Sequence, residues 1–163
     1  MIQANDLLNA YQLSRKAVYE AVEGLSQEHA TWKPAEQAKS IQELVVHLGG
    51  AERFWLGTLG YEVLDFPTSD ELSEAVAFAQ GMEGIIAKQL KEATPEKLNE
   101  KVSTERGDLS LAWLVKRVNQ HMFYHLGTLV YLRMIVEPDW EGEAGLSTWQ
   151  KAVDTFSSLV ETE

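Results

Sequence analysis

The chain has 163 residues, a formal net charge of −11 and no cysteine. Its length suits one compact domain covering residues 1–163 around a single sizeable core. The lack of cysteine excludes a disulfide framework, a thiolate metal site and a catalytic thiol, so any metal must be held by imidazole and carboxylate groups. The excess of acid argues against a nucleic-acid partner or an anionic membrane surface, because both require clustered Lys and Arg.

Neither an export signal nor a membrane span is evident in the sequence. The N-terminal stretch MIQANDLLNAYQ lacks the basic region and the uninterrupted apolar stretch of a signal peptide. The longest apolar run, LGTLVYLRMIV, is interrupted by Arg133 and is too short to cross a bilayer. We therefore expect a cytoplasmic protein without membrane contact.

Apolar residues recur at three- and four-residue steps in several long segments, which is the spacing of amphipathic helices. The expected helices cover roughly residues 3–25, 41–60, 69–92 and 110–136, followed by a terminal helix that carries Trp149, Val153, Phe156 and Val160. Capping boxes are expected before two of these helices, from Ser40 with Glu43 and from Ser147 with Gln150, whereas Ser69 or Asp70 should cap the third helix.

The connections between these helices are rich in polar and turn-forming residues. Residues 26–40 and 61–68 are predicted as loops, and residues 94–110 as a polar connection with one helical turn after Pro95. No strand-like alternation or hairpin signal is present. Gly49 and Gly50 lower the helix propensity of the second helix, but they allow a neighbouring helix or a ligand to approach closely. The prediction is an all-α protein, a four-helix bundle with an extra C-terminal helix packed across it.

The stretch NQHMFYHLG places His121 and His125 one helical turn apart in the most apolar predicted helix. Side chains four residues apart share a helix face, so both rings are expected to point inward together with Leu114 and Val118. Buried imidazoles need partners, and a divalent metal satisfies two of them at once. The alternative is a pair of hydrogen-bonded packing residues.

A third imidazole is available at His47, beside the apolar stripe of the second helix. If the second and fourth helices lie side by side, His47, His121 and His125 converge, and such a site leaves coordination positions open for water or substrate. Taken alone, His47 is more often a packing residue than a metal ligand. The zinc-protease motif H-E-x-x-H is absent because Met122 occupies the position of the glutamate, which excludes that peptidase class. His29 lies in a predicted loop and is given no role.

The strings SIQELVVHLGGAERFWL and NQHMFYHLGTLVYLR, together with the loop LSQEHATWKP, resemble the DinB/YfiT-like superfamily. The resemblance extends from the first helix to about Met134. It implies an up-down-down-up four-helix bundle, a homodimer, and a divalent metal, nickel or zinc, held by His47, His121 and His125. Its characterised members include transferases and isomerases that use a low-molecular-weight thiol. The chain departs from many relatives at Leu126, where they carry Arg, so a polar group near the metal is expected to be missing.

Other residues receive weaker assignments. Glu43 lies four residues before His47 and is either its hydrogen-bond partner or, as we favour, part of the capping box. Asn119 and Gln120 are expected to face solvent. Glu83 is either an acid/base group that faces the bundle interior or, as we favour, a solvent-facing residue. Aromatic residues near the histidines either line a pocket or belong to the core, and we favour the core for most of them; they are Phe54, Trp55, Trp113, Phe123 and Tyr124.

Two functions remain open at this stage. The first is a metal-dependent enzyme that acts on a small-molecule substrate, such as a thiol S-transferase or a hydrolase, in which the metal lowers the pKa of a bound thiol or water. The second is a non-catalytic bundle in which the metal stabilises the fold, or which binds a small molecule or mediates dimerisation. No catalytic acid or base can be named from the sequence.

Overall fold

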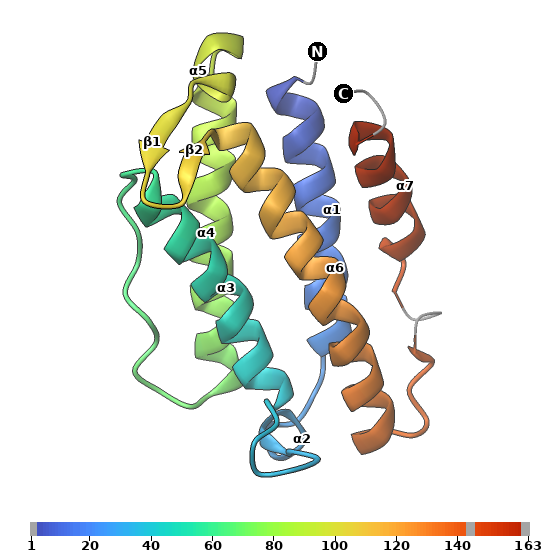
Figure 1. The fold of residues 1–163 in the computed structure, drawn as a ribbon. Coiled ribbons are helices and arrows are strands. Elements are labelled where there is room, and N and C mark those ends of the chain that lie inside the picture. Colours follow the sequence, from blue (N-terminus) through green and yellow to red (C-terminus); the bar gives the residue numbers. More distant parts are fainter. Residues whose placement is uncertain (1–2, 143–145, 161–163) are drawn as a thin grey trace.

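Four long helices form a bundle with an up-down-down-up course (Figure 1). The computed structural model describes residues 3–142 and 146–160. Helices α1 and α3 each pack against both α4 and α6, and a terminal helix, α7, packs against α1. The bounds are Ala4–Val22 for α1, Ile41–Thr58 for α3, Leu72–Glu92 for α4, Leu111–Val136 for α6 and Trp149–Val160 for α7. The predicted all-α bundle with an extra C-terminal helix is confirmed.

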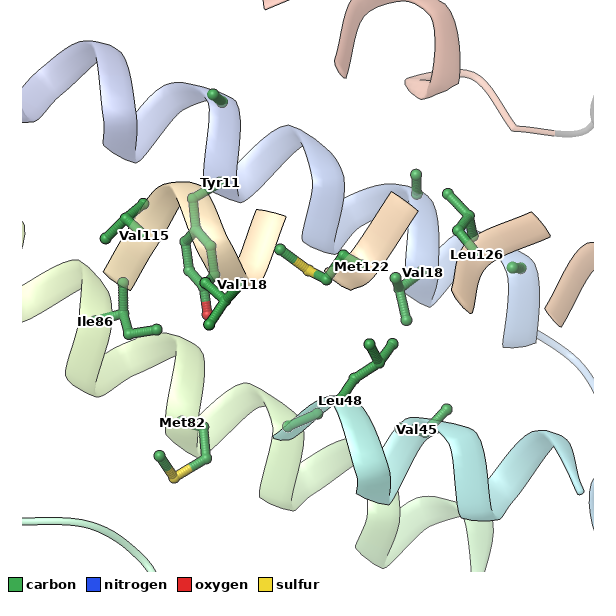
Figure 2. Packing of buried hydrophobic residues seen from close by; sticks show 14 of the residues in the cluster. Tyr11, Val18, Val45, Leu48, Met82, Ile86, Val115, Val118, Met122 and Leu126 are labelled. Carbon is green, nitrogen blue, oxygen red and sulfur yellow. The ribbon is translucent and has the colours of Figure 1, made fainter. Parts of the chain in front are cut away.

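The hydrophobic core lies along the bundle axis, where apolar side chains of all four long helices meet (Figure 2). Burying one such aliphatic side chain contributes about 1.5–3 kcal/mol, so the shared axis is the main source of stability. Within the described residues, no helix combines the length and the apolar character needed to cross a membrane. The core residues labelled in Figure 2 are Tyr11, Val18, Val45, Leu48, Met82, Ile86, Val115, Val118, Met122 and Leu126.

The starts of the two helices that carry the histidine pattern are fixed by side-chain caps. The Ser40 hydroxyl accepts a hydrogen bond from the Glu43 N–H, and the Glu43 carboxylate accepts one from the Ser40 N–H at 2.8 Å, so the predicted capping box is confirmed. The Ser110 hydroxyl accepts from the Trp113 N–H at 3.2 Å at the start of α6. Both helices therefore begin where the sequence predicts.

The start of α4 differs from the prediction. Neither Ser69 nor Asp70 caps this helix; the N–H of Leu72 instead donates to the side-chain oxygen of Gln27 at 2.8 Å. The Gln27 amide nitrogen donates in turn to the Asp70 carbonyl at 2.6 Å and to Gln42 at 3.0 Å. The cap was missed because it comes from a residue 45 positions earlier in the chain.

Two of the predicted connections contain regular structure. Residues 26–40, predicted as a loop, include a short helix α2 (Gln27–Thr31), at whose start the Ser26 hydroxyl accepts a hydrogen bond from the His29 N–H. The helical turn predicted after Pro95 is present as α5 (Pro95–Asn99). The expectation of no strands was wrong, because β1 (Val102–Thr104) and β2 (Gly107–Leu109) form an antiparallel hairpin. Each strand has only three residues, too few to show alternation.

The predicted capping box of the terminal helix is not formed. Ser147 and Thr148 use their hydroxyls to donate to the Glu20 carboxylate of α1, at 2.6 and 3.0 Å. The ring of Phe123 on α6 contacts Trp149 and Phe156 of α7, with ring centroids 5.7 and 5.4 Å apart. The terminal helix is thus fastened to the bundle by one polar and one aromatic cluster.

Residues 59–71 run back along the outside of α3 and α4, because α3 and α4 point the same way (Figure 1).

Glycines make room for the neighbours of α3. A Cβ at Gly49 would lie 2.8 Å from the Phe78 ring of α4, and one at Gly50 would lie 3.0 Å from the Phe66 ring of residues 59–71. The close approach expected of these paired glycines is confirmed.

Candidate metal centre

The three predicted histidines come together on the neighbouring helices α3 and α6. These helices run in opposite directions, and Trp55 of α3 meets Trp113 of α6 with ring centroids 4.9 Å apart. The same pairing brings His47 opposite His121, with ring centroids also 4.9 Å apart. His125 follows one helical turn after His121, and its ring centroid lies 4.8 Å from that of His47. The predicted convergence is thus present, and we call these residues the histidine triad.

The triad is arranged around the Nε2 atom of His121. This atom lies 3.2 Å from Nε2 of His47 and 3.0 Å from Nε2 of His125. One coordinating atom from each ring lies within 4.8 Å of the others, a group that could hold a metal ion. Among the described His, Asp and Glu side chains, no fourth one joins this group.

The triad lies at the edge of the core. All three histidines are half-buried, whereas the expectation was that His121 and His125 would point into the bundle interior. The inward face of this part of α6 is formed by Met122 and Leu126, each only 1% exposed (Figure 2). Because each turn of an α-helix has 3.6 residues, the histidines lie beside this apolar face and meet both solvent and protein.

All three imidazoles favour the neutral form. Burial is the first cause and, together with the nearby His125, His47 and Arg117, it lowers the pKa of His121 to about 4. Burial, followed by the positive charge of Lys39, also lowers the pKa of His47, and burial with His47 and Lys39 lowers that of His125. Neutral imidazoles have free lone pairs at neutral pH, which is the form that binds a metal.

The donor set fits a divalent transition metal. Two nitrogens bound to zinc at 2.0–2.1 Å in tetrahedral geometry are about 3.3 Å apart, and the two short Nε2 separations of the triad are close to this value. Imidazole suits zinc, nickel, copper and iron, so the ligand types do not select one metal. Three protein ligands without a fourth resemble the catalytic rather than the structural class of zinc site.

A groove of about 720 Å³ adjoins the triad, with His47 and His121 in its wall. It follows α3 between residues 59–71 and α6. Its apolar wall includes Phe54, Trp55 and Phe66. Phe54 and Trp55 therefore line a pocket, although we expected most aromatic residues near the triad to belong to the core. Phe123 instead contacts the terminal helix, and Tyr124 lies against His125 while remaining 75% exposed.

Several residues outside the triad have definite positions. Glu43 serves the capping box and receives the Lys33 ammonium at 2.6 Å, so the favoured assignment is confirmed. His29 lies away from the triad, with Nδ1 3.3 Å from Glu137. Glu83 is half-buried and accepts a hydrogen bond from Tyr19 at 2.8 Å, so it does not simply face solvent.

Asn119 was expected to face solvent and is instead completely buried. Its position three residues before Met122 places it on the inward face of α6. Its side-chain amide has no hydrogen-bond partner among the described residues. Gln120 is exposed, as expected. The expectation for Asn119 was wrong because α6 is buried over more of its circumference than we assumed.

A second buried polar cluster links α1 to α3. Arg15 and Glu52, 0% and 1% exposed, form an ion pair, and the Tyr11 hydroxyl donates to Glu52 at 2.8 Å. Burial raises the pKa of Glu52, and the adjoining Arg15 guanidinium opposes this shift. The sequence did not reveal this cluster, because charged and aromatic residues are common in amphipathic helices and nothing in the local pattern shows that these three residues meet.

Two cations beside the triad were also missed. Arg117 precedes His121 by four residues and therefore shares its helix face, so helical spacing could have identified it. Lys39 lies just before the capping residue of α3 and outside the helix, so helical spacing could not have placed it near the histidines. Both line the groove, together with Arg53.

A four-helix bundle that carries three imidazoles on its second and fourth long helices, beside an open groove, defines a class of candidate metalloprotein. A family model described as the DinB superfamily matches residues 10–129, a range that includes all three histidines, and the chain belongs to this superfamily. In a comparison with curated proteins, no sequence matches the chain. Leu126, the position at which the chain departs from the expected Arg, is a buried core residue.

Proposed function

We propose that the protein is a metal-dependent enzyme that transfers a low-molecular-weight thiol to small electrophiles, with nickel or zinc on the histidine triad. The observation that carries this proposal is the triad itself, with Nε2 separations of 3.2 and 3.0 Å at the wall of a groove of about 720 Å³. Three neutral imidazoles with no fourth ligand in the described residues favour an open coordination position over a purely structural site.

A divalent metal bound there would lower the pKa of a thiol or a water molecule and so raise its nucleophilicity at neutral pH. The residues of the chain serve the other requirements of such a reaction. His47, His121 and His125 remain neutral and ready to bind the metal. Phe54 and Trp55 give the groove an apolar wall that excludes water and holds the carbon skeleton of a substrate.

A non-catalytic role for the bundle is supported by a different observation. One of the two short Nε2 contacts can also be a hydrogen bond between neutral imidazoles, because the Nε2 atom of His121 carries either one proton or one lone pair. Such a bond would satisfy part of the triad without a metal. Furthermore, the described hydrogen bonds of the triad include no carboxylate that could act as an acid or base. The decisive difference between the two functions is turnover that depends on the metal.

The test begins with elemental analysis of the purified protein and continues with thiol-conjugation assays using several low-molecular-weight thiols and a chromogenic aryl halide. We expect one bound metal per chain, and we expect His47→Ala to lose both metal and turnover. His29→Ala is the matched control, because His29 contacts Glu137 outside the triad and its loss should change neither. Full activity in the metal-free protein would rule out the proposal.

A further inference from the structure

The groove beside the triad carries positive charge on a protein with a formal net charge of −11. Lys39, Arg53 and Arg117 line it, against the acidic residues Glu43 and Asp70. Such a local concentration of cations on an acidic chain directs anions to the groove, because the field of nearby charges outweighs that of distant, screened ones.

The three cations are not equally available to a ligand. Arg53 is engaged, since its Nε donates to the Leu64 carbonyl at 2.7 Å and its guanidinium lies 4.9 Å from the centre of the Phe66 ring. Lys39 and Arg117 are exposed and form neither a hydrogen bond nor an ion pair with the side chains that the structure describes. Glu43 already receives the Lys33 ammonium, which leaves Asp70 as the groove carboxylate without an ion-pair partner.

Lys39 and Arg117 lie on opposite sides of the triad along the groove. Lys39 lies just before the start of α3, eight residues ahead of His47, and Arg117 precedes His121 by one turn on the oppositely directed α6. The charge of Lys39 acts on His47 and His125, and the charge of Arg117 acts on His121. A molecule placed at the triad therefore meets a cation on either side.

The aromatic wall of the groove indicates which apolar group a ligand would carry. Phe54 and Trp55 meet edge to face, with ring centroids 4.9 Å apart, and Phe66 lines the same groove from residues 59–71. This wall suits an apolar or aromatic group, while the cations suit a carboxylate.

We propose that the groove binds a small organic acid, with its carboxylate held by Arg117 or Lys39 and its apolar part on Phe54, Trp55 and Phe66. The proposal builds on the proposed function, since it names the class of substrate or cosubstrate for the same site. It excludes neutral apolar molecules as preferred ligands, because their binding would leave both cations without a partner.

The experiment compares 3-phenylpropionate with 3-phenylpropanamide, which have similar shapes and differ in charge. Calorimetric titrations are performed on the zinc-loaded and the metal-free full-length protein. We expect the acid to bind at least about tenfold more tightly than the amide, since a charged hydrogen bond contributes about 1.4 kcal/mol or more. The double variant Lys39→Gln/Arg117→Gln should lose this preference, whereas Lys88→Gln, an exposed lysine of α4 outside the groove lining, should retain it.

Two results would overturn the inference. Equal affinity for acid and amide, including no measurable binding of either, would show that the groove does not select anions. A preference that survives in the double variant and disappears on metal removal would assign the carboxylate to the metal alone. Failure of the proposed function would appear in other measurements, namely turnover and metal content. A protein without turnover or metal could still prefer the acid to the amide when it is titrated in the metal-free form.

Discussion

His121 holds the central position of the triad, since its Nε2 is the atom that approaches both other imidazoles. Its neighbours on either side in the sequence have different roles. Met122 fills the core and Gln120 faces solvent, so a shift of one residue would move the imidazole out of the site. The arrangement of the triad therefore depends on the helical register of α6 as much as on the residue type.

The low pKa of His121, about 4, has a consequence for stability in the metal-free protein. Between an unfolded pKa of about 6.5 and the folded value, the unfolded chain binds a proton on this imidazole that the folded chain does not. The stability associated with the neutral ring is therefore fully present above about pH 6.5 and is lost as the pH falls toward 4. His47 and His125, whose pKa values are also lowered, act in the same direction.

We expect the thermal midpoint of chelator-treated protein to fall between pH 7.5 and pH 5.5, and to fall less in His121→Gln, which has no proton to gain at this position. Circular dichroism melts at the two pH values measure both differences. Equal pH dependence in the two proteins would show that the His121 ring is not held neutral by its surroundings.

At the scale of elements, the glycines of α3 set how closely its neighbours approach. Gly49→Ala would place a methyl group 2.8 Å from the Phe78 ring and 3.5 Å from the Ala79 backbone, so α4 or the ring must shift. Overpacking of this kind costs about 1–3 kcal/mol. Gly84→Ala is the control, because a Cβ there meets nothing within 4 Å, and it should stabilise the helix by about 0.5–1 kcal/mol.

Urea unfolding of both alanine variants measures these changes in the free energy of unfolding. A Gly49→Ala protein as stable as the Gly84→Ala protein would contradict the close packing of α3 against α4.

The long helices were predictable because their apolar spacing is regular, and the start of α6 because Ser110 is a standard cap. The hairpin was not, since strands of three residues show no alternation and its turn residues, Glu105 and Arg106, lack the usual Asn-Gly or Asp-Gly signal. The triad followed from spacing on two helices. The Gln27 cap of α4 and the position of Phe66 against Gly50 depend on contacts between distant segments, which a local pattern does not contain.

At the scale of the whole molecule, the Arg15–Glu52 pair joins the first long helix to the helix that carries His47. Removing one member leaves an unpaired buried charge, so Glu52→Leu should destabilise the fold by about 3–5 kcal/mol. The double variant Arg15→Met/Glu52→Leu removes both charges and should recover much of this loss. Chemical denaturation of the two variants measures the difference, and a double variant no more stable than Glu52→Leu would show that the cost does not come from the unpaired arginine.

The homodimer stays a prediction. The outer face of α6 exposes large apolar side chains, Tyr131 at 67% and Tyr124 at 75%, with Met134 and Ile135 nearby. A second copy of the chain packed on this face would cover them, and we expect Tyr131→Lys to convert a dimer into a monomer. Size-exclusion chromatography with light scattering measures the mass, and a monomeric wild-type protein would remove the dimer from consideration.

The parallel course of α3 and α4 requires residues 59–71 to return along the whole bundle, and this same segment supplies Phe66 to one wall of the groove. A short turn between two antiparallel helices would have left that wall open to water. The groove is thus composed of one half on the helices α3 and α6 and one half on a connection between helices. A substitution at Phe66 can therefore alter which molecules the groove accepts without replacing any residue of the two helices that carry the three imidazoles.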